Sequence, residues 1–220
     1  MEDFINTFKD KSRHHQKLIN FLYPKLNQIQ NGNILEFGVS EKGMSTQLFL
    51  EFSKKSNCKL FSIDNVNYSS KFVNDNWKFF HTRDDNFDVI EKYINKELDV
   101  IYLDTIHKAD HVEKIIYNYF EKLKVGGFFF IDDTSWLPYI KNAQRDNFYC
   151  EINNKETFDK LLEIYNVNLD KFDMNFDFTS SGMCKIIKKS ESLSKPKKIS
   201  TRILSFKNLI RKIIGFFKKI

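Results

Sequence analysis

The sequence of 220 residues predicts one α/β domain with a mostly parallel, doubly wound sheet covered by helices on both faces. Two observations predict it. Short apolar segments typical of strands alternate with amphipathic segments typical of helices, as parallel β-α-β units require. Acidic residues follow several of the apolar segments, and ligands of open parallel sheets bind at this end of the strands. Apolar residues make up 41% of the chain, which is enough to build a full core.

The expected elements follow one another along the chain. Residues 1–31 are expected to be mostly helical, with a break or kink at Pro24. Strands are expected within residues 31–39, 58–64, 76–82, 98–104 and 124–133, with helices at 44–52 and 111–123. A helix near residues 155–164 and an antiparallel pair of strands near 174–178 and 183–187 should close the domain. Residues 188–198 are typical of a polar linker. We therefore divide the chain into a helical cap (1–30), the main domain (31–188) and a basic linker with an amphipathic helix (189–220).

Charge and cysteine content narrow the class of protein. The net charge is +6, but residues 195–220 hold nine Lys and Arg and no acidic residue, so the rest of the chain has a net charge of −3. A body of this charge disfavours nucleic-acid binding. The N-terminus is too polar for a secretory signal, and no apolar segment is long enough to span a bilayer. Three widely spaced cysteines, Cys58, Cys150 and Cys184, indicate reduced thiols in a cytoplasmic protein.

A glycine-containing loop follows the first strand, from Glu36 to Ser45. Gly38 allows a ligand to approach the backbone, and Gly43 allows a tight turn before the helix. The loop lacks the G-x-G-x-x-G pattern of dinucleotide sites and the Gly-Lys-Ser/Thr of phosphate loops. Asp64 ends the next strand, where its carboxylate could accept hydrogen bonds from both hydroxyls of a ribose or cap the following turn. Its combination with the glycine loop favours the ribose.

A second group of polar residues follows two later strands. Asp104 and His107 come after residues 98–104, and Asp132 and Asp133 end the next strand. Neighbouring strands lie about 4.8 Å apart, so these side chains can converge. Three close carboxylates raise one another's pKa unless a cation neutralises them, and Mg²⁺ prefers such oxygen ligands. The alternatives are that the acidic pair only ends a strand and caps a helix, and that His107 is a cap or surface residue.

Four motifs resemble class I S-adenosylmethionine-dependent methyltransferases. ILEFGVSEKGMST resembles their first motif, and FSID resembles their ribose-binding acid. LDVIYLDTIHKADHV and LKVGGFFFIDDTSW are similar to the fourth and fifth strands of the macrocin-type sugar O-methyltransferases. The resemblance covers roughly residues 31–136. It implies a Rossmann-like sheet of seven strands with an antiparallel last strand, and S-adenosylmethionine as the methyl donor.

The resemblance also assigns roles to residues. Gly38 would pack against the amino-acid moiety of the cofactor, and Glu36 would hold water or the cofactor ammonium. Asp84 or Asp85 would approach the adenine, although both could instead belong to a solvated acidic turn. His107 would be the catalytic base. The expected cofactor residues are Glu36, Gly38, Gly43, Ser45, Asp64, Asp84, Asp85 and Asp104, and the expected Mg²⁺ ligands are Asp104, Asp132 and Asp133.

The expected function is O-methylation of a hydroxyl on a sugar or glycan precursor. One alternative is a nicotinamide-dependent enzyme, which the missing G-x-G-x-x-G disfavours. The other is a membrane-attached adaptor without catalysis, which the intact Asp64, Asp104 and His107 disfavour.

The C-terminal residues 199–220 have a helical pattern with one apolar stripe. The stripe contains Ile203, Phe206, Leu209, Ile210, Ile213, Ile214 and Phe217, and lysines and arginines fill the remaining positions. Such a helix is suited to lying in the surface of an anionic membrane. The stripe could instead pack on the domain itself or on a second subunit of a homo-oligomer. Nucleic-acid binding by the tail is a weaker alternative.

Overall fold

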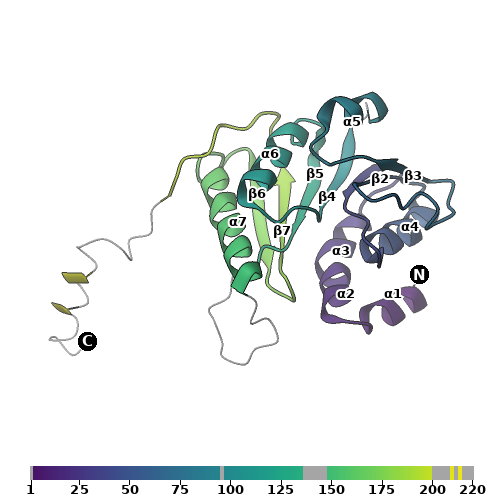
Figure 1. Ribbon diagram of the computed structural model, residues 1–220, viewed down its shortest axis with the longest axis horizontal. Helices are drawn as coiled ribbons and strands as arrows, with labels where there is room; N and C mark the ends of the chain where they lie inside the picture. The colour runs from purple at the N-terminus through teal and green to yellow at the C-terminus, as the bar shows by residue number, and fades with distance from the viewer. Residues whose placement is uncertain (1, 95–96, 136–147, 200–208, 211–212, 215–220) are drawn as a thin grey trace.

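The computed structural model describes residues 2–94, 97–135, 148–199, 209–210 and 213–214. They form a seven-stranded sheet with strand order β3-β2-β1-β4-β5-β7-β6 (Figure 1). The first five strands are parallel, and β7 runs antiparallel to both β5 and β6. This confirms the predicted sheet. The strands are β1 (Asn33–Phe37), β2 (Lys59–Asp64), β3 (Trp77–His81), β4 (Leu98–Leu103), β5 (Leu123–Asp132), β6 (Phe172–Asp177) and β7 (Met183–Lys188).

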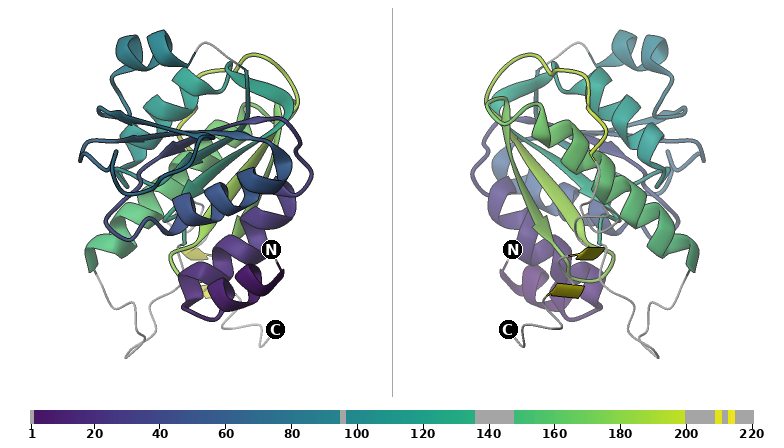
Figure 2. Two further views of the ribbon diagram at one scale, coloured as in Figure 1. Left: turned by 90° about the vertical axis from the view of Figure 1, so that its right-hand side faces the viewer. Right: turned by 90° about the vertical axis from the view of Figure 1, so that its left-hand side faces the viewer.

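Helices cover both faces of the sheet (Figures 1 and 2). One face carries α1 (Glu2–Lys9), α2 (Arg13–Lys17), the π-helical turn η1 (Leu18–Leu22), α3 (Tyr23–Leu26) and α4 (Met44–Ser56). The other carries α5 (Phe87–Tyr93), α6 (Ala109–Tyr119) and α7 (Phe148–Asn166). The sequence analysis had not predicted α5, whose seven residues follow an acidic turn.

The two-residue period of the strands sorts the side chains between these faces. In β1, β2, β4 and β5, even-numbered residues such as Ile34, Val100 and Phe130 pack under α1–α4, and odd-numbered residues such as Leu35 and Ile101 pack under α5–α7. The polar even-numbered residues of the central strands therefore lie on the face that the N-terminal helices cover. This placement assembles most of the buried polar groups described below.

The N-terminal helices belong to the core of the domain. Leu18, Leu22 and Leu26 are fully buried and share a cluster with residues of β1, β4 and β5. The predicted disturbance at Pro24 is present as the π-helical turn that precedes it, where the Tyr23 N–H bonds to the carbonyl of Leu18. Pro24 itself lies in the first turn of α3, where its missing N–H costs little.

The segment after β7, predicted to be a polar linker, has no helix or strand in its described residues 189–199 and is hydrogen-bonded to the domain. Lys189 and Ser190 donate backbone hydrogen bonds to the carbonyl of Lys171, and the Ser194 N–H donates to Asn168 Oδ1 at 2.7 Å. Tyr117 Oη in turn donates to the Ser194 carbonyl. These hydrogen bonds hold the segment along α6 and α7.

Most of the predicted C-terminal helix lies outside the described residues. The four residues described there, at positions 209–210 and 213–214, are helical, and their apolar side chains are exposed. Among the described residues, none of the helices combines the length and apolarity needed to cross a bilayer. Cys58 and Cys184 are buried free thiols, as expected, whereas the side chain of Cys150 lies outside the described part.

Candidate functional site

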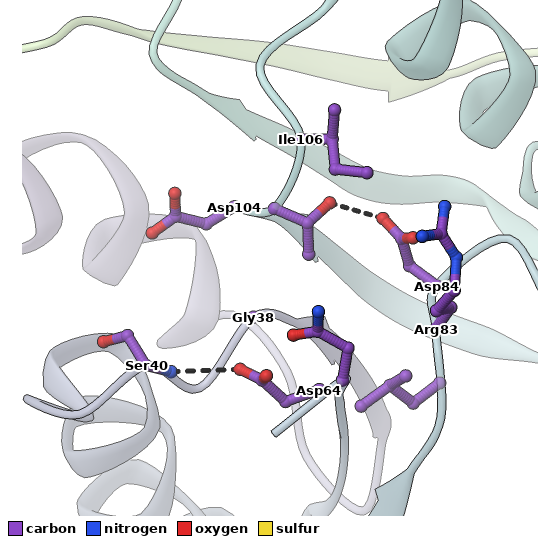
Figure 3. Close-up of a pocket in the computed structure, with 10 residues that line it drawn as sticks. Gly38, Ser40, Asp64, Arg83, Asp84, Asp104 and Ile106 are labelled. Carbon is purple, nitrogen blue, oxygen red and sulfur yellow. Dashed lines mark hydrogen bonds between the residues drawn. The ribbon is translucent and has the colours of Figure 1, made fainter.

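A cavity of about 300 Å³ opens where β1, β2, β3 and β4 end (Figure 3). Its position at the carboxyl ends of parallel strands is the one expected for a ligand. It brings together four of the predicted cofactor residues, Gly38, Asp64, Asp84 and Asp104. The remaining lining residues are Ser40, Ile63, Asn65, Arg83, Thr105 and Ile106.

Gly38 keeps β1 and β4 close together at the cavity wall. Its φ of +93° is one that L side chains rarely adopt, and a Cβ there would lie 2.0 Å from the Asp104 carbonyl oxygen. The neighbouring backbone is paired, since the Asp104 N–H donates to the Phe37 carbonyl at 2.9 Å. Glycine at this position is therefore required by the fold, and it also exposes backbone to the cavity.

Asp64 caps the turn that follows β2, which is one of the two roles that the sequence left open, and the ribose role stays a prediction. Its Oδ2 accepts the N–H groups of Val39 at 2.8 Å and Ser40 at 3.2 Å, so the carboxylate holds the loop after β1. Its Oδ1 accepts the Val66 N–H at 2.8 Å and caps the turn after β2. A carboxylate has about four lone-pair sites, so about one remains, on Oδ1, for a ribose hydroxyl.

Asp84 and Asp85 differ in their surroundings. Asp84 is buried at the cavity wall, where its Oδ2 accepts the Thr105 hydroxyl and lies 2.7 Å from His111 Nε2. Asp85 points to the surface and pairs with Arg83 at 2.9 Å and Lys114 at 3.4 Å. Its hydrogen bond from Arg83 lowers the pKa of Asp85 to about 2. Of the two candidates for the adenine site, the structure places Asp84 in the cavity wall.

Glu36 is fully buried under α4 and lies outside the lining of this cavity. Its carboxylate accepts the hydroxyls of Ser45 at 2.6 Å, Thr46 at 2.9 Å and Ser62 at 2.6 Å. Burial raises the pKa of Glu36 to about 7 although these hydrogen bonds oppose the shift. Ser45 is thus a partner of Glu36, and Gly43 forms the left-handed N-cap of α4 against Phe72.

His107 lies between two carboxylates, just past the cavity residues Thr105 and Ile106. Its Nε2 is 3.6 Å from Asp104 Oδ1 and 3.4 Å from Asp133 Oδ2, and each of the three side chains is partly exposed. Burial raises the pKa of Asp104 well above its usual value, and the charges of Asp132 and Asp133 add to the effect. The expected grouping of acids around His107 is therefore partly formed.

Asp132 forms an ion pair with a residue that was not predicted to belong to the site. The Lys17 ammonium contacts Asp132 Oδ1 in a buried ion pair. The same oxygen accepts the Asp133 N–H at 2.7 Å, and Oδ2 accepts the Tyr102 hydroxyl at 2.7 Å. Burial alone would raise the pKa of Asp132, but the charges of Lys17 and His14 and the hydrogen bonds from Lys17 and Tyr102 together lower it to about 2.

These contacts do not fit the expected Mg²⁺ site. Both oxygens of Asp132 already accept hydrogen bonds, and an ammonium group neutralises the charge that a metal would have neutralised. Across the described residues, no group of three or more His, Cys, Asp or Glu is arranged to hold a metal ion. Lys17 pairs with Asp132 at the end of β5, so these contacts do not support the predicted ligand set of Asp104, Asp132 and Asp133.

The comparisons with known proteins agree with this geometry. Residues 35–134 match the family model of a methyltransferase domain. They include every cavity residue and His107. No curated protein matches the sequence.

Three solved structures share the fold. MycE, a methyltransferase of the mycinamycin biosynthetic pathway in complex with Mg and SAH, has a TM-score of 0.61 and 14% identity over 89% of this chain and 57% of its own. SAH-bound PaMTH1 of Podospora anserina has a TM-score of 0.60 and 13% identity over 86% of this chain and 87% of its own. A putative caffeoyl-CoA O-methyltransferase from Staphylococcus aureus has a TM-score of 0.58 and 17% identity over 84% of this chain and 91% of its own. The chain thus spans less than two thirds of the length of MycE.

The family match is thus to a methyltransferase domain, and these solved methyltransferases share the fold of the chain. The family match, which is to a methyltransferase domain, favours methyl transfer over the nicotinamide-dependent alternative.

Several residues of the cavity and of the buried polar groups beside it were not predicted from the sequence. Tyr102 and Ser62 could have been found from strand periodicity, because they share the even-numbered face with Glu36 and Asp132. Thr105 could have been found from its place directly after Asp104. Lys17 gave no signal, since a lysine in a helix is usually exposed.

Proposed function

We propose that the protein transfers a methyl group from S-adenosylmethionine to a hydroxyl on a sugar or glycan precursor, in the cytoplasm. One observation carries the proposal. Asp64, Asp84 and Asp104, which follow three different strands, line one cavity beside Gly38 within the segment that matches a methyltransferase domain. S-adenosylmethionine supplies an electrophilic methyl group on a sulfonium, so the protein has to bind the donor and prepare the acceptor.

The cavity residues would hold the donor. Asp64 would accept a ribose hydroxyl on Oδ1, while its bonds to Val39 and Ser40 keep the loop in place. Gly38 would leave room for the amino-acid moiety, and the wall around Asp84 and Ile106 would face the adenine. Glu36 would act indirectly, by fixing the start of α4 through Ser45 and Thr46.

His107 would prepare the acceptor. A neutral hydroxyl is a poor nucleophile, and a general base that removes its proton typically accelerates such a step by about 10²–10⁴-fold. Once protonated, His107 would be stabilised by the carboxyl groups of Asp104 and Asp133, whose oxygens lie 3.6 Å and 3.4 Å from Nε2. The two carboxylates would also fix the orientation of the ring. No step in this account uses a metal ion.

The acceptor class has weaker support. MycE has been solved with Mg, SAH and mycinamycin VI, and the protein from Staphylococcus aureus is named as a putative O-methyltransferase. Both favour a small-molecule hydroxyl as the acceptor. The exposed Leu209, Ile210, Ile213 and Ile214 favour attachment of the tail to an anionic membrane surface. That location would suit an enzyme acting on a lipid-linked glycan.

A transfer assay tests the proposal. Full-length protein is incubated with methyl-labelled S-adenosylmethionine and, separately, with lipid-linked glycans, nucleotide sugars, catechols and RNA. We expect label on a sugar hydroxyl as an ether that survives mild alkali, with one S-adenosylhomocysteine formed per methyl. Label found only on RNA or on an amine would contradict the proposed acceptor, and the His107→Ala variant controls for transfer by contaminants.

A further inference from the structure

Lys17 is a fixed positive charge inside the carboxylate cluster. Its side chain is 0% exposed, and its ammonium contacts Asp132 Oδ1, Ser181 Oγ at 2.8 Å and the Gly182 carbonyl at 3.1 Å. An ammonium has three N–H donors, and these three acceptors use all of them. A charge that is buried, paired and fully hydrogen-bonded has no means of exchanging readily with solvent ions.

The partners of Asp132 leave little room for a second cation. Oδ1 accepts Lys17, the Asp133 N–H at 2.7 Å and the Ser181 hydroxyl at 3.3 Å. Oδ2 accepts the Tyr102 hydroxyl at 2.7 Å. A divalent ion that used the remaining lone pair of Oδ2 would share this carboxylate with an ammonium that already neutralises its charge.

We infer that Lys17 takes the place of a divalent metal ion, so that the methyl transfer proposed above runs without one. The inference rests on that proposed function. Lys17 acts as a positioning residue: it neutralises Asp132, and Asp132 holds Tyr102 and the backbone of Asp133. This leaves Asp104 and Asp133 beside His107, where they can handle the acceptor proton. Lys17 and Asp132 are 115 residues apart, so the N-terminal helices complete the site.

Binding of Mn²⁺, measured by the loss of its free electron paramagnetic resonance signal, tests the inference without an acceptor. Wild type, Lys17→Ala and the control Lys188→Ala are compared as full-length proteins. Lys188 is a matched control because it is equally buried but binds the carbonyls of Leu123 and Glu121 at the opposite end of β5. We expect Lys17→Ala to bind about one Mn²⁺ at least tenfold more tightly than wild type and Lys188→Ala.

Lys17→Gln provides a second variant, because it keeps an N–H donor toward Asp132 and removes the charge. Mn²⁺ should also raise the unfolding temperature of either Lys17 variant and leave that of wild type unchanged. Stoichiometric Mn²⁺ binding by wild type that disappears in Asp132→Asn would overturn the inference. A folded Lys17 variant that gains no Mn²⁺ affinity would overturn it too, since the carboxylates would then form no cation site.

The same samples are titrated with S-adenosylhomocysteine, which separates the two proposals. If none of the proteins binds S-adenosylhomocysteine, the methyltransferase function is contradicted. The comparison of their Mn²⁺ affinities can still be interpreted. Binding of Mn²⁺ by wild type would count only against the role of Lys17.

Discussion

The Cα atom of Gly38 packs so closely against the Asp104 carbonyl that a Cβ at residue 38 would lie 2.0 Å from that oxygen. Both residues line the cavity, so the contact that closes the gap between β1 and β4 also shapes the proposed cofactor site. The oxygen belongs to backbone held by the sheet and cannot move aside as a flexible side chain could. Packing and ligand binding therefore depend on the same glycine.

Gly38→Ala should lower the free energy of unfolding by more than about 4 kcal/mol, because it adds a backbone clash to an unfavourable φ. Gly126→Ala is the matched control. Gly126 also has a positive φ, of +83°, but an added Cβ there would meet nothing within 4 Å. Gly126→Ala should lower the free energy of unfolding by only about 1–2 kcal/mol, the usual strain of a left-handed residue. Urea denaturation measures both, and equal losses would contradict the assigned role of the contact.

Glu36 should make stability depend on pH in a defined window. Its pKa is raised by burial from 4.5 to about 7 in the folded protein, so the folded state binds the extra proton. Stability contributed by this proton is present below about pH 4.5 and is lost as the pH rises through about 7, by up to about 3 kcal/mol. Glu36→Gln should remove that part of the slope.

The check is urea denaturation of wild type and Glu36→Gln at several pH values between 5 and 8. The free energies of unfolding of the two proteins should differ least at pH 5. As the pH rises, the variant should become more stable relative to wild type. Parallel curves over the whole range would show that Glu36 does not carry the raised pKa.

His107→Ala should lower the turnover rate by about 10²–10⁴-fold, the usual effect of losing a general base. Affinity for S-adenosylhomocysteine should stay within about twofold of wild type, because His107 lies outside the cavity lining. His81→Ala, which replaces an exposed histidine at the end of β3, serves as the control. A His107 variant with normal turnover would remove the base from the mechanism.

The C-terminal tail should bind vesicles that contain anionic lipid, and binding should weaken as salt rises, since each surface base contributes only about 1 kcal/mol. Replacing Ile210 and Phe217 with Glu should abolish binding, whereas replacing Lys212 and Lys218 with Gln should only weaken it. Sedimentation with vesicles measures each. If deletion of residues 199–220 causes aggregation and the intact protein ignores anionic vesicles, the tail belongs to the fold or to a subunit interface.

Local patterns in the sequence were enough to predict the sheet. Most of the strands have a run of apolar residues, and in β6 apolar and polar residues alternate. The glycine and acidic residues at the strand ends indicated the cavity around Gly38, Asp64 and Asp104. The α5 helix was missed because its seven residues are too few for a clear helical period. The hydrogen bonds that hold the segment after β7 against the domain could not be predicted, because they leave no trace in composition.

The charged part of the site was harder to predict for a physical reason. The sequence places Asp104, Asp132 and Asp133 at neighbouring strand ends but does not show which cation approaches them. Lys17 reaches Asp132 only because η1 and α3 pack their leucines under the sheet, and this is a tertiary effect. Charge pairing between residues 115 positions apart has no local signature.

Calorimetric titration with S-adenosylhomocysteine tests the central claim most directly, using wild type, Asp64→Ala and Asp75→Ala. Asp75 is an exposed aspartate outside the cavity lining and serves as the control. Wild type and Asp75→Ala should bind one equivalent with equal affinity, and Asp64→Ala should lose about 1–3 kcal/mol, or about 5–150-fold, through its charge-assisted hydrogen bonds. NAD should give no saturable heat. Saturable binding of NAD in place of S-adenosylhomocysteine, or unchanged affinity in a folded Asp64→Ala variant, would contradict the account.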